Sequence, residues 1–140
     1  METRDILTKL KNGELSIDEA ESFFRRQPYE EMGYAKLDMH RKVRSGFSEV
    51  IFCSGKTDEH LLNIFGKLYE QDNEVMGTRA SQHQYELIKE QYPMALYDSV
   101  SRIIKIEKPD KQLKGKIAVC TAGTADIPVA EEAAQTAEYF

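Results

Sequence analysis

The feature of this sequence that most constrains its fold is the spacing of apolar residues between residues 34 and 106, which changes several times. Short strand-like runs alternate there with stretches in which apolar residues recur every three or four positions. The predicted strands are residues 35–40, 49–53, 74–78, 95–98 and 102–106, and the predicted helices are residues 55–70 and 81–92. Strands that alternate with helices of this length indicate an α/β domain.

Two short helices are expected before this alternating region. Residues 2–11 carry apolar side chains at helical spacing. Asn12-Gly13 follows as a helix stop, because glycine readily adopts the left-handed backbone angles of a C-terminal cap. Ser16 and Glu19 have the spacing of a capping box, in which two side chains bond each other's backbone N–H. The sequence therefore predicts a helical N-terminus.

The helices of the alternating region begin with residues that can cap them. Thr57 and Ser81 are the predicted N-caps, and Pro93 marks the end of the second helix. In the first helix, five apolar side chains fall on one face and are predicted to be buried: Leu61, Leu62, Ile64, Phe65 and Leu68.

The best linker is EKPDKQLKGK, residues 107–116, which holds a proline, a glycine and four lysines in ten positions. We therefore expect an N-terminal domain over residues 1–108, a linker over residues 109–115 and the start of a second domain over residues 116–140.

The last 25 residues resemble the opening of a phosphate-binding site. Lys116–Cys120 is predicted to be a buried strand, and the small residues that follow would let a ligand approach the backbone closely. Asp126 is the predicted N-cap of a helix. Glu131 and Glu132 would stabilise the positive end of that helix and would oppose a phosphate placed there, so Asp126 and the loop backbone are better suited to bind a ribose.

The net charge excludes some classes of partner. The chain carries 19 basic and 24 acidic residues, a formal net charge of −5, whereas dedicated nucleic-acid binders usually have a basic balance. No apolar run approaches the ~20 residues that span a bilayer, and residues 1–14 lack the order of a signal peptide. We therefore expect a cytoplasmic protein with neither nucleic acid nor a membrane as partner.

The two cysteines are predicted to be reduced core thiols. Cys53 and Cys120 lie far apart, each in a strand-like apolar run, and neither belongs to a Cys/His cluster with the spacing of metal ligands. No metal site is expected.

The most polar candidate for chemistry lies between residues 37 and 57. Asp38 and His40 share one face of a predicted strand, and Arg41, Arg44 and Lys56 add cations near loops. A nucleotide phosphate or a carboxylate would suit this set. The alternative is a solvated charged loop in which Asp38 pairs with Arg41 or Arg44.

Two further features place cations where a strand ends. Gly55-Lys56-Thr57 lies where a strand gives way to a helix, and free N–H groups there favour an anion. It is not a P-loop, because Val50 stands where the first glycine of that motif is required. Arg79 follows another predicted strand, where it could bind a ligand or make a structural salt bridge equally well.

Three segments together resemble the LarB family, pyridinium-3,5-biscarboxylic acid mononucleotide synthases whose C-terminal domain is related to the PurE carboxylases. The segments are AKLDMHRKVRSGFSEVIFCSGKT, MGTRAS and KIAVCTAGTADIPVAEEA, in that order. The resemblance runs from about Ile6 to the last residue. It implies a small N-terminal α/β domain with a helical N-terminus, followed by the first strand and a partial helix of a PurE-like, flavodoxin-like domain.

The resemblance also implies the parent enzyme's activity. Such enzymes add a carboxyl group from CO2 or bicarbonate to the pyridinium ring of nicotinic acid adenine dinucleotide and cleave its phosphoanhydride, releasing AMP. The product feeds the nickel-pincer nucleotide cofactor of lactate racemase. A cysteine thiolate attacks the ring, which makes a neighbouring carbon nucleophilic. No covalently bound cofactor is implied, and a requirement for Mg²⁺ stays open.

The sequence departs from the family pattern at two places. The family's nucleophilic cysteine lies in a later part of the PurE-like domain, and neither Cys53 nor Cys120 matches it. The PurE-type loop reads Gly-Ser-x-Ser-Asp, and here Asp126 alone carries over, as a ribose or substrate ligand. Ala125 lacks the expected hydroxyl, for which Thr124 is a possible substitute. We therefore expect a truncated chain that does not catalyse carboxylation alone.

The resemblance and the residue patterns together give one set of expectations. No catalytic residue is assigned, and the partners are a nucleotide substrate and, for the parent enzyme, further copies of itself. The segment from Lys116 onward is expected to be disordered, docked on the edge of the N-terminal domain, or paired with another copy. The alternative function is a non-enzymatic assembly or regulatory domain that sets the oligomer geometry of the PurE-like core. The predicted substrate-binding residues are Asp38, His40, Arg41, Arg44, Lys56, Arg79, Gly123, Thr124 and Asp126.

Overall fold

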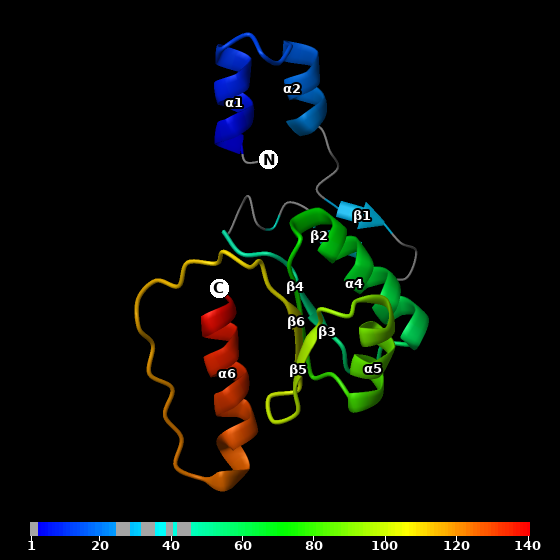
Figure 1. Cartoon of the computed structure of the whole chain (residues 1–140), viewed down its shortest axis with the longest axis vertical. Helices are drawn as coiled ribbons and strands as arrows, with labels where there is room; N and C mark the ends of the chain where they lie inside the picture. The colour runs from blue at the N-terminus through cyan, green and yellow to red at the C-terminus, as the bar shows by residue number, and fades with distance from the viewer. Residues whose placement is uncertain (1–2, 25–28, 32–35, 39–40, 42–45) are drawn as a thin grey trace. The chain divides into compact units, whose positions relative to one another are not determined.

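The computed structural model of the chain describes residues 3–24, 29–31, 36–38, 41 and 46–140 (Figure 1). The predicted α/β class is confirmed, because these residues form five α-helices and a four-stranded sheet, which is mixed. The chain divides into two compact units, Met1–Gly46 and Phe47–Phe140. None of the helices among the described residues is long and apolar enough to cross a membrane.

The first unit contains the predicted helical N-terminus. Helix α1 (Thr3–Lys11) buries Ile6, and helix α2 (Ile17–Phe24) buries Ala20. The capping box at the start of α2 is confirmed, since the backbone N–H of Ser16 donates to Glu19 Oε2 at 2.8 Å and the N–H of Glu19 donates to Ser16 Oγ at 3.2 Å.

A two-stranded antiparallel hairpin belongs to the same unit. Strand β1 (Tyr29–Glu31) pairs with strand β2 (Lys36–Asp38), with Tyr29 opposite Asp38. Strand β2 lies within the predicted strand at residues 35–40.

The second unit is built on a sheet with the strand order β3-β4-β6-β5. Strands β3 and β4 are parallel, and β6 runs antiparallel to both of its neighbours. All four strands fall where the sequence predicts strands: β3 (Val50–Phe52), β4 (Val75–Thr78), β5 (Leu96–Asp98) and β6 (Ile103–Ile106).

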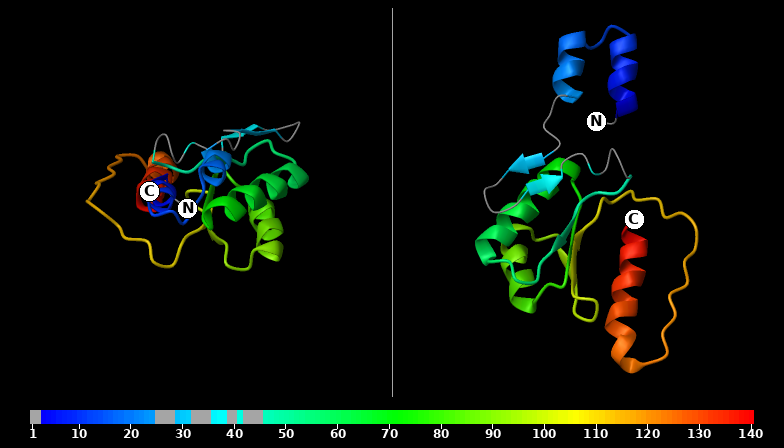
Figure 2. Two further views of the ribbon diagram at one scale, coloured as in Figure 1. Left: turned by 90° about the horizontal axis from the view of Figure 1, so that it is seen from above. Right: turned by 180° about the vertical axis from the view of Figure 1, so that it is seen from behind.

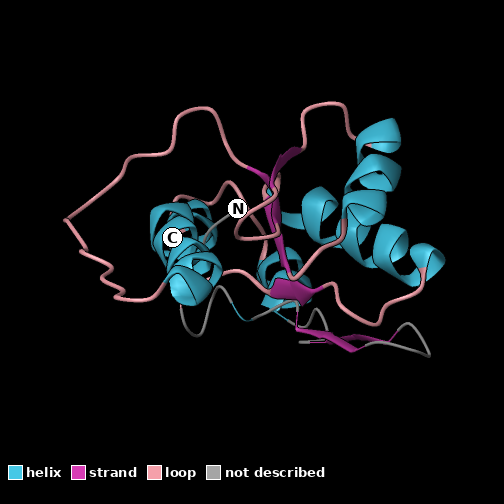
Figure 3. Cartoon of the chain, turned by 90° about the horizontal axis from the view of Figure 1, so that it is seen from below, coloured by secondary structure: helices cyan, strands magenta, loops and turns pink. Residues whose placement is uncertain are grey.

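Two helices cover one face of this sheet (Figures 1 and 3). Helix α4 (Asp58–Asp72) connects β3 to β4, and α5 (Gln82–Gln91) follows β4. Both predicted N-caps are confirmed: the Thr57 hydroxyl accepts from the His60 N–H at 3.3 Å, and Ser81 forms a capping box with Gln84.

The core on this side matches the predicted apolar stripe of α4. Leu61, Ile64, Phe65 and Leu68 are buried, whereas Leu62 is only half-buried. The Phe65 ring lies 5.4 Å from that of Tyr92, centroid to centroid.

A third helix, α6 (Ile127–Tyr139), covers the opposite face of the sheet (Figures 2 and 3). Its Tyr139 side chain joins Met76 and Ile103 in a cluster whose members are each 1% exposed. Of the three outcomes expected for the C-terminal segment, docking is the one observed, and the helix docks on a face of the sheet rather than on its edge.

The segment between β6 and α6 departs from the expectations. Lys116–Cys120 forms no strand, because it pairs with none of the strands of the sheet and therefore makes no ladder hydrogen bonds. Ile117 is 74% exposed, and Cys120 is exposed rather than part of a core. Asp126 is the last residue of a short 3-10 turn, η1 (Thr124–Asp126), and its carboxylate makes no cap hydrogen bond to the start of α6. Its backbone has right-handed helical angles, φ −91° and ψ −8°, whereas a capping residue usually has extended angles. The predicted domain boundaries at residues 108 and 116 stay predictions.

Candidate anion-binding edge of the sheet

The parallel pair β3 and β4 brings two loops to the same edge of the sheet. Phe52 lies opposite Thr78, so the residues that follow each strand emerge side by side. We call the residues of these two loops, Cys53–Thr57 and Arg79–Ser81, the carboxyl edge. The predicted cations Lys56 and Arg79 both belong to it.

The first loop turns sharply into helix α4. Gly55 has φ +77°, which glycine adopts without the steric cost that a Cβ would add, and the Lys56 N–H donates to the Cys53 carbonyl at 3.2 Å. Among the described residues, no atom lies within 4 Å of the position that a Cβ on Gly55 would occupy. A ligand can therefore approach the backbone at this turn.

The start of α4 is less favourable to an anion than its position suggests. Asp58 and Glu59 occupy the first turn, where their charges offset the positive end of the helix. His83 of α5 pairs with Asp58 at 2.8 Å, and this hydrogen bond raises the pKa of the His83 imidazole. These two acids make the start of α4 a poor position for a bound anion.

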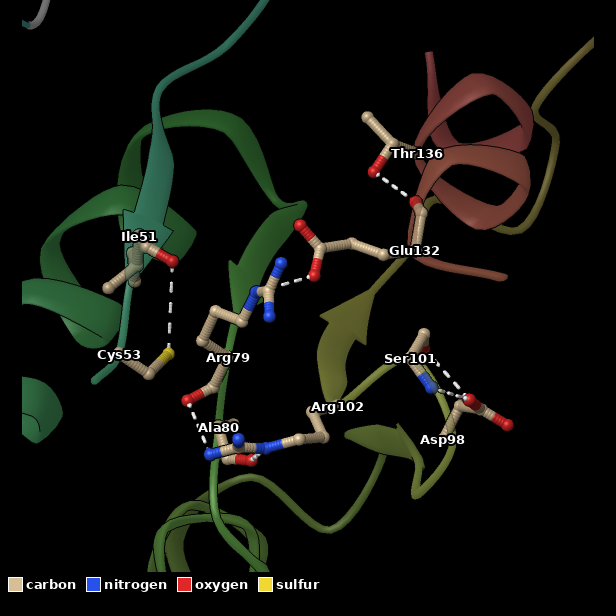
Figure 4. Close-up of polar contacts among 9 residues, drawn as sticks. All are labelled: Ile51, Cys53, Arg79, Ala80, Asp98, Ser101, Arg102, Glu132 and Thr136. Atoms are coloured by element: carbon tan, nitrogen blue, oxygen red, sulfur yellow. Dashed lines mark hydrogen bonds and ion pairs between the residues drawn. The ribbon is translucent and has the colours of Figure 1, made fainter. Parts of the chain in front are cut away.

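Arg79 is the cation that the structure holds most firmly at this edge (Figure 4). Its Nε lies 2.8 Å from Oε2 of Glu132 on α6, and its side chain is 43% exposed. The sequence left open a ligand contact or a salt bridge; the salt bridge is present, and it uses one of the five N–H donors of the guanidinium. A guanidinium with free donors can also bind a second carboxylate or a phosphate.

The carboxyl edge is tied to the core through a residue that sequence reasoning missed. Gln84, which is buried, donates from its side-chain amide to the Cys53 carbonyl at 3.0 Å. The same side chain completes the capping box of α5. In the sequence, Gln84 stands three residues after Ser81, as in a capping box. That spacing predicts the start of a helix but not the hydrogen bond to Cys53.

Cys53 is not equipped to act as a nucleophile. Its side chain is fully buried, and desolvation raises the pKa of the thiol to about 12, against a smaller opposing effect of Lys56. A Cβ on Gly77 would lie 2.7 Å from the Cys53 sulfur, so the neighbouring strand closes directly over it. The group stays a neutral thiol at physiological pH, in line with its predicted role as a core thiol.

The other predicted site residues do not belong to these two loops. Gly123, Thr124 and Asp126 are exposed, on the segment that leads into α6. Arg41 is exposed and belongs to the first unit. The Asp38 side chain, His40 and Arg44 lie outside the described residues, so the predicted pairing of Asp38 and His40 on one strand face, and its alternative, stay predictions.

The structure thus defines a class: a mixed α/β domain in which a basic residue follows each of its two parallel strands. Residues 29–108 match the LarB/PurE-like N-terminal domain, and the chain belongs to this family. It is also similar to the uncharacterized protein MJ0165 of Methanocaldococcus jannaschii, with 35% identity over 147 aligned positions. That alignment takes in 98% of this chain and 57% of the relative, so the chain spans little more than half of the relative's length.

Proposed function

We propose that this chain is the substrate-holding part of a LarB-type enzyme, one that carboxylates the pyridinium ring of nicotinic acid adenine dinucleotide and hydrolyses its phosphoanhydride. Family membership supports the class of reaction. The observation that supports the binding role is that Lys56 and Arg79 follow two adjacent parallel strands, because two cations suit a ligand with two adjacent phosphates.

The proposed reaction balances without an oxidant. A thiolate adds to the electron-poor ring, and the neighbouring ring carbon then bonds to CO2. A base removes the proton from that carbon and the thiolate leaves, so the ring regains its aromaticity and has exchanged a proton for a carboxylate. Hydrolysis then adds water across the phosphoanhydride and yields AMP and the carboxylated mononucleotide.

The carboxylation step needs a nucleophile that we do not assign to this chain. Cys53 is buried and protonated, and its neighbours leave no room for a pyridinium ring beside the sulfur. We therefore expect no turnover when the 140-residue chain is incubated with the dinucleotide, bicarbonate and Mg²⁺, as monitored by chromatographic detection of AMP. AMP formation at a rate proportional to the chain's concentration would contradict this expectation.

Calorimetric titration tests the binding role. Nicotinic acid adenine dinucleotide is expected to bind the chain. NAD, which has an amide in place of the acid group, tests the contribution of that group to affinity. AMP, which has one phosphate, tests the contribution of the second phosphate and the pyridinium half. Arg79→Ala should weaken binding about tenfold, the effect of losing one charge-assisted contact. The matched control is Arg4→Ala, which removes the same charge from an exposed position of the first unit and should leave the affinity unchanged. If none of the three nucleotides binds at millimolar concentration, the binding role fails.

A second candidate is a non-enzymatic assembly domain that sets the oligomer geometry of a PurE-like core. It is favoured by exposed apolar side chains along the segment between β6 and the first turns of α6. These side chains are Leu113, Ile117, Val119, Ile127 and Val129. Sedimentation of the chain separates the two candidates, because an assembly domain self-associates in the absence of nucleotide.

A further inference from the structure

The strand that leads into Arg79 shifts register just before that residue. Along the ladder between β4 and β6, Gly77 lies opposite Ile104, but the Ala80 N–H donates to the Arg102 carbonyl at 2.9 Å. Two residues of one strand, Thr78 and Arg79, therefore lie opposite a single residue of the other. This is the arrangement of a β-bulge, which bends a strand and turns a side chain in a new direction.

Both arginines at this bulge have backbone angles that non-glycine residues rarely adopt. Arg79 has φ +55° and Arg102 has φ +59°. The left-handed region is unfavourable for side chains with a Cβ, and such residues persist only where surrounding contacts hold them. The residues that hold the Arg79 backbone at these angles therefore also determine where the Arg79 side chain points.

The side chain of Arg102 supplies these contacts (Figure 4). Its Nε donates to the Ala80 carbonyl at 2.9 Å and its Nη2 donates to the Arg79 carbonyl at 3.2 Å. With the backbone bond from the Ala80 N–H, three hydrogen bonds join Arg102 to two successive peptide groups. The planar guanidinium holds these two carbonyls in a fixed relation, which a lysine could not reproduce.

We infer that Arg102 is a positioning residue for oxyanion binding: it fixes the bulge from which the Arg79 guanidinium extends toward Glu132 of α6. This inference rests on the proposed binding role of Arg79 and names the residue on which that role depends. The ligand group is an oxyanion, either a phosphate or a carboxylate of the dinucleotide. The role inferred for Arg102 is indirect, because its Nε and Nη2 donate to the backbone of Ala80 and Arg79.

The fold does not depend on these side-chain contacts alone. The Tyr97 hydroxyl also donates to the Ala80 carbonyl, at 3.3 Å, and the backbone bond from Ala80 to Arg102 does not involve the arginine side chain. Removal of the Arg102 guanidinium should therefore loosen Arg79 while leaving the sheet intact.

The test measures the affinity of the chain for nicotinic acid adenine dinucleotide in a set of variants. Arg102→Ala and Arg102→Gly both remove the guanidinium, and both should weaken binding about tenfold by releasing the preorganised Arg79. They should differ in thermal stability, because glycine adopts the left-handed angles at position 102 more easily than alanine. Arg102→Lys, which keeps the charge without the planar fork, should recover little of the affinity.

A double variant separates positioning from any other role. In the Arg79→Ala background, Arg102→Ala should cause no further loss of affinity, since the side chain that it positions is already gone. Equal losses in both backgrounds, or wild-type affinity in Arg102→Ala and Arg102→Gly, would overturn the inference.

The results separate the positioning role of Arg102 from the binding role of Arg79 on which it rests. If the unmodified chain binds no dinucleotide, both fall. If it binds and Arg79→Ala weakens binding while the Arg102 variants do not, the binding role stands and only the positioning role is lost.

Discussion

The two faces of the sheet in the second unit are covered in different ways. Helices α4 and α5 cover one face through short connections to the strands, and hydrogen-bonding caps fix where both begin. Helix α6 covers the other face after a long exposed segment, and its start has no side-chain cap. The first face is built from neighbours in sequence, whereas the second depends on a few contacts of one helix.

The chemistry of these contacts also differs between the faces. Buried apolar side chains such as Leu61, Phe65 and Ile88 dominate beneath α4 and α5. Under α6 the buried anchor is Tyr139, whose hydroxyl has no hydrogen-bond partner among the described residues. Lys111 covers its ring at 3.8 Å from the centroid, and the Arg79–Glu132 pair adds a half-exposed contact. The α6 face should therefore open at a lower cost in free energy than the α4/α5 face.

The largest expected effect breaks the first face. Phe65→Ala removes a fully buried ring and should lower the free energy of unfolding by about 3–5 kcal/mol, a large share of the roughly 5–15 kcal/mol typical of a domain. Urea denaturation followed by circular dichroism measures the loss. The control Leu113→Ala, at a 65% exposed position, should change stability by less than about 0.5 kcal/mol. A similar small change in Phe65→Ala would remove the distinction between the faces.

The next effect opens the second face alone. Tyr139→Ala should lower the stability by about 1–3 kcal/mol, because α6 can leave its face without unfolding the rest. Hydrogen exchange with mass spectrometry should show lost protection in Ile127–Tyr139 and retained protection in α4. If protection in α4 falls together with that in α6, the two faces form one cooperative unit.

A smaller effect of opposite sign concerns the unpartnered hydroxyl. Burial, together with the nearby carboxylates of Glu74, Glu107 and Asp72, raises the pKa of the Tyr139 phenol well above its usual value. The group therefore stays neutral, and no described residue gives its buried oxygen a hydrogen bond in return for the lost contact with water. Tyr139→Phe should be neutral or stabilising by up to about 1 kcal/mol in thermal denaturation. A clear destabilisation would show that the hydroxyl has a partner.

The smallest expected effect concerns the ion pair between His83 of α5 and Asp58 of α4, on the first face. The hydrogen bond to Asp58 raises the pKa of His83, so the pair stabilises the folded chain fully below the unfolded-state pKa of about 6.5. That stabilisation is lost as the pH rises through the folded-state pKa. His83→Gln should therefore lower the thermal midpoint slightly at pH 5.5 and leave it unchanged at pH 9. A difference that grows with pH would contradict this sign.

Much of the first face could be predicted because its signals are local. Thr57, Ser81 and the apolar period of α4 each report on residues within one or two turns, and all agree with the fold except at Leu62, which is half-buried. The position of Lys56 and Arg79 at one edge also follows from consecutive parallel strands. Helix caps and apolar periodicity depend on residues that are close together in the chain, so they can be recognised from the sequence alone.

The rest depends on contacts between distant residues. Glu132 was expected to stabilise the start of a helix, but it pairs with Arg79, more than fifty positions away in the chain. The left-handed angles of Arg79 and Arg102 had no sequence signal, since glycine or asparagine is the usual residue at such angles. Lys116–Cys120 has the composition of a strand, yet a strand also requires a partner, and composition does not reveal one.

The exposed segment that leads to α6 determines the effective concentration of that helix at its face of the sheet. Residues 112–126 are all exposed, and a flexible chain of 15 residues has ends that lie about 20 Å apart on average. A helix on such a tether meets its own face of the sheet as if dissolved at about millimolar concentration. Contacts too weak to hold two separate molecules together therefore suffice to keep α6 in place. A helix from a second molecule must reach a comparable concentration before it can replace α6.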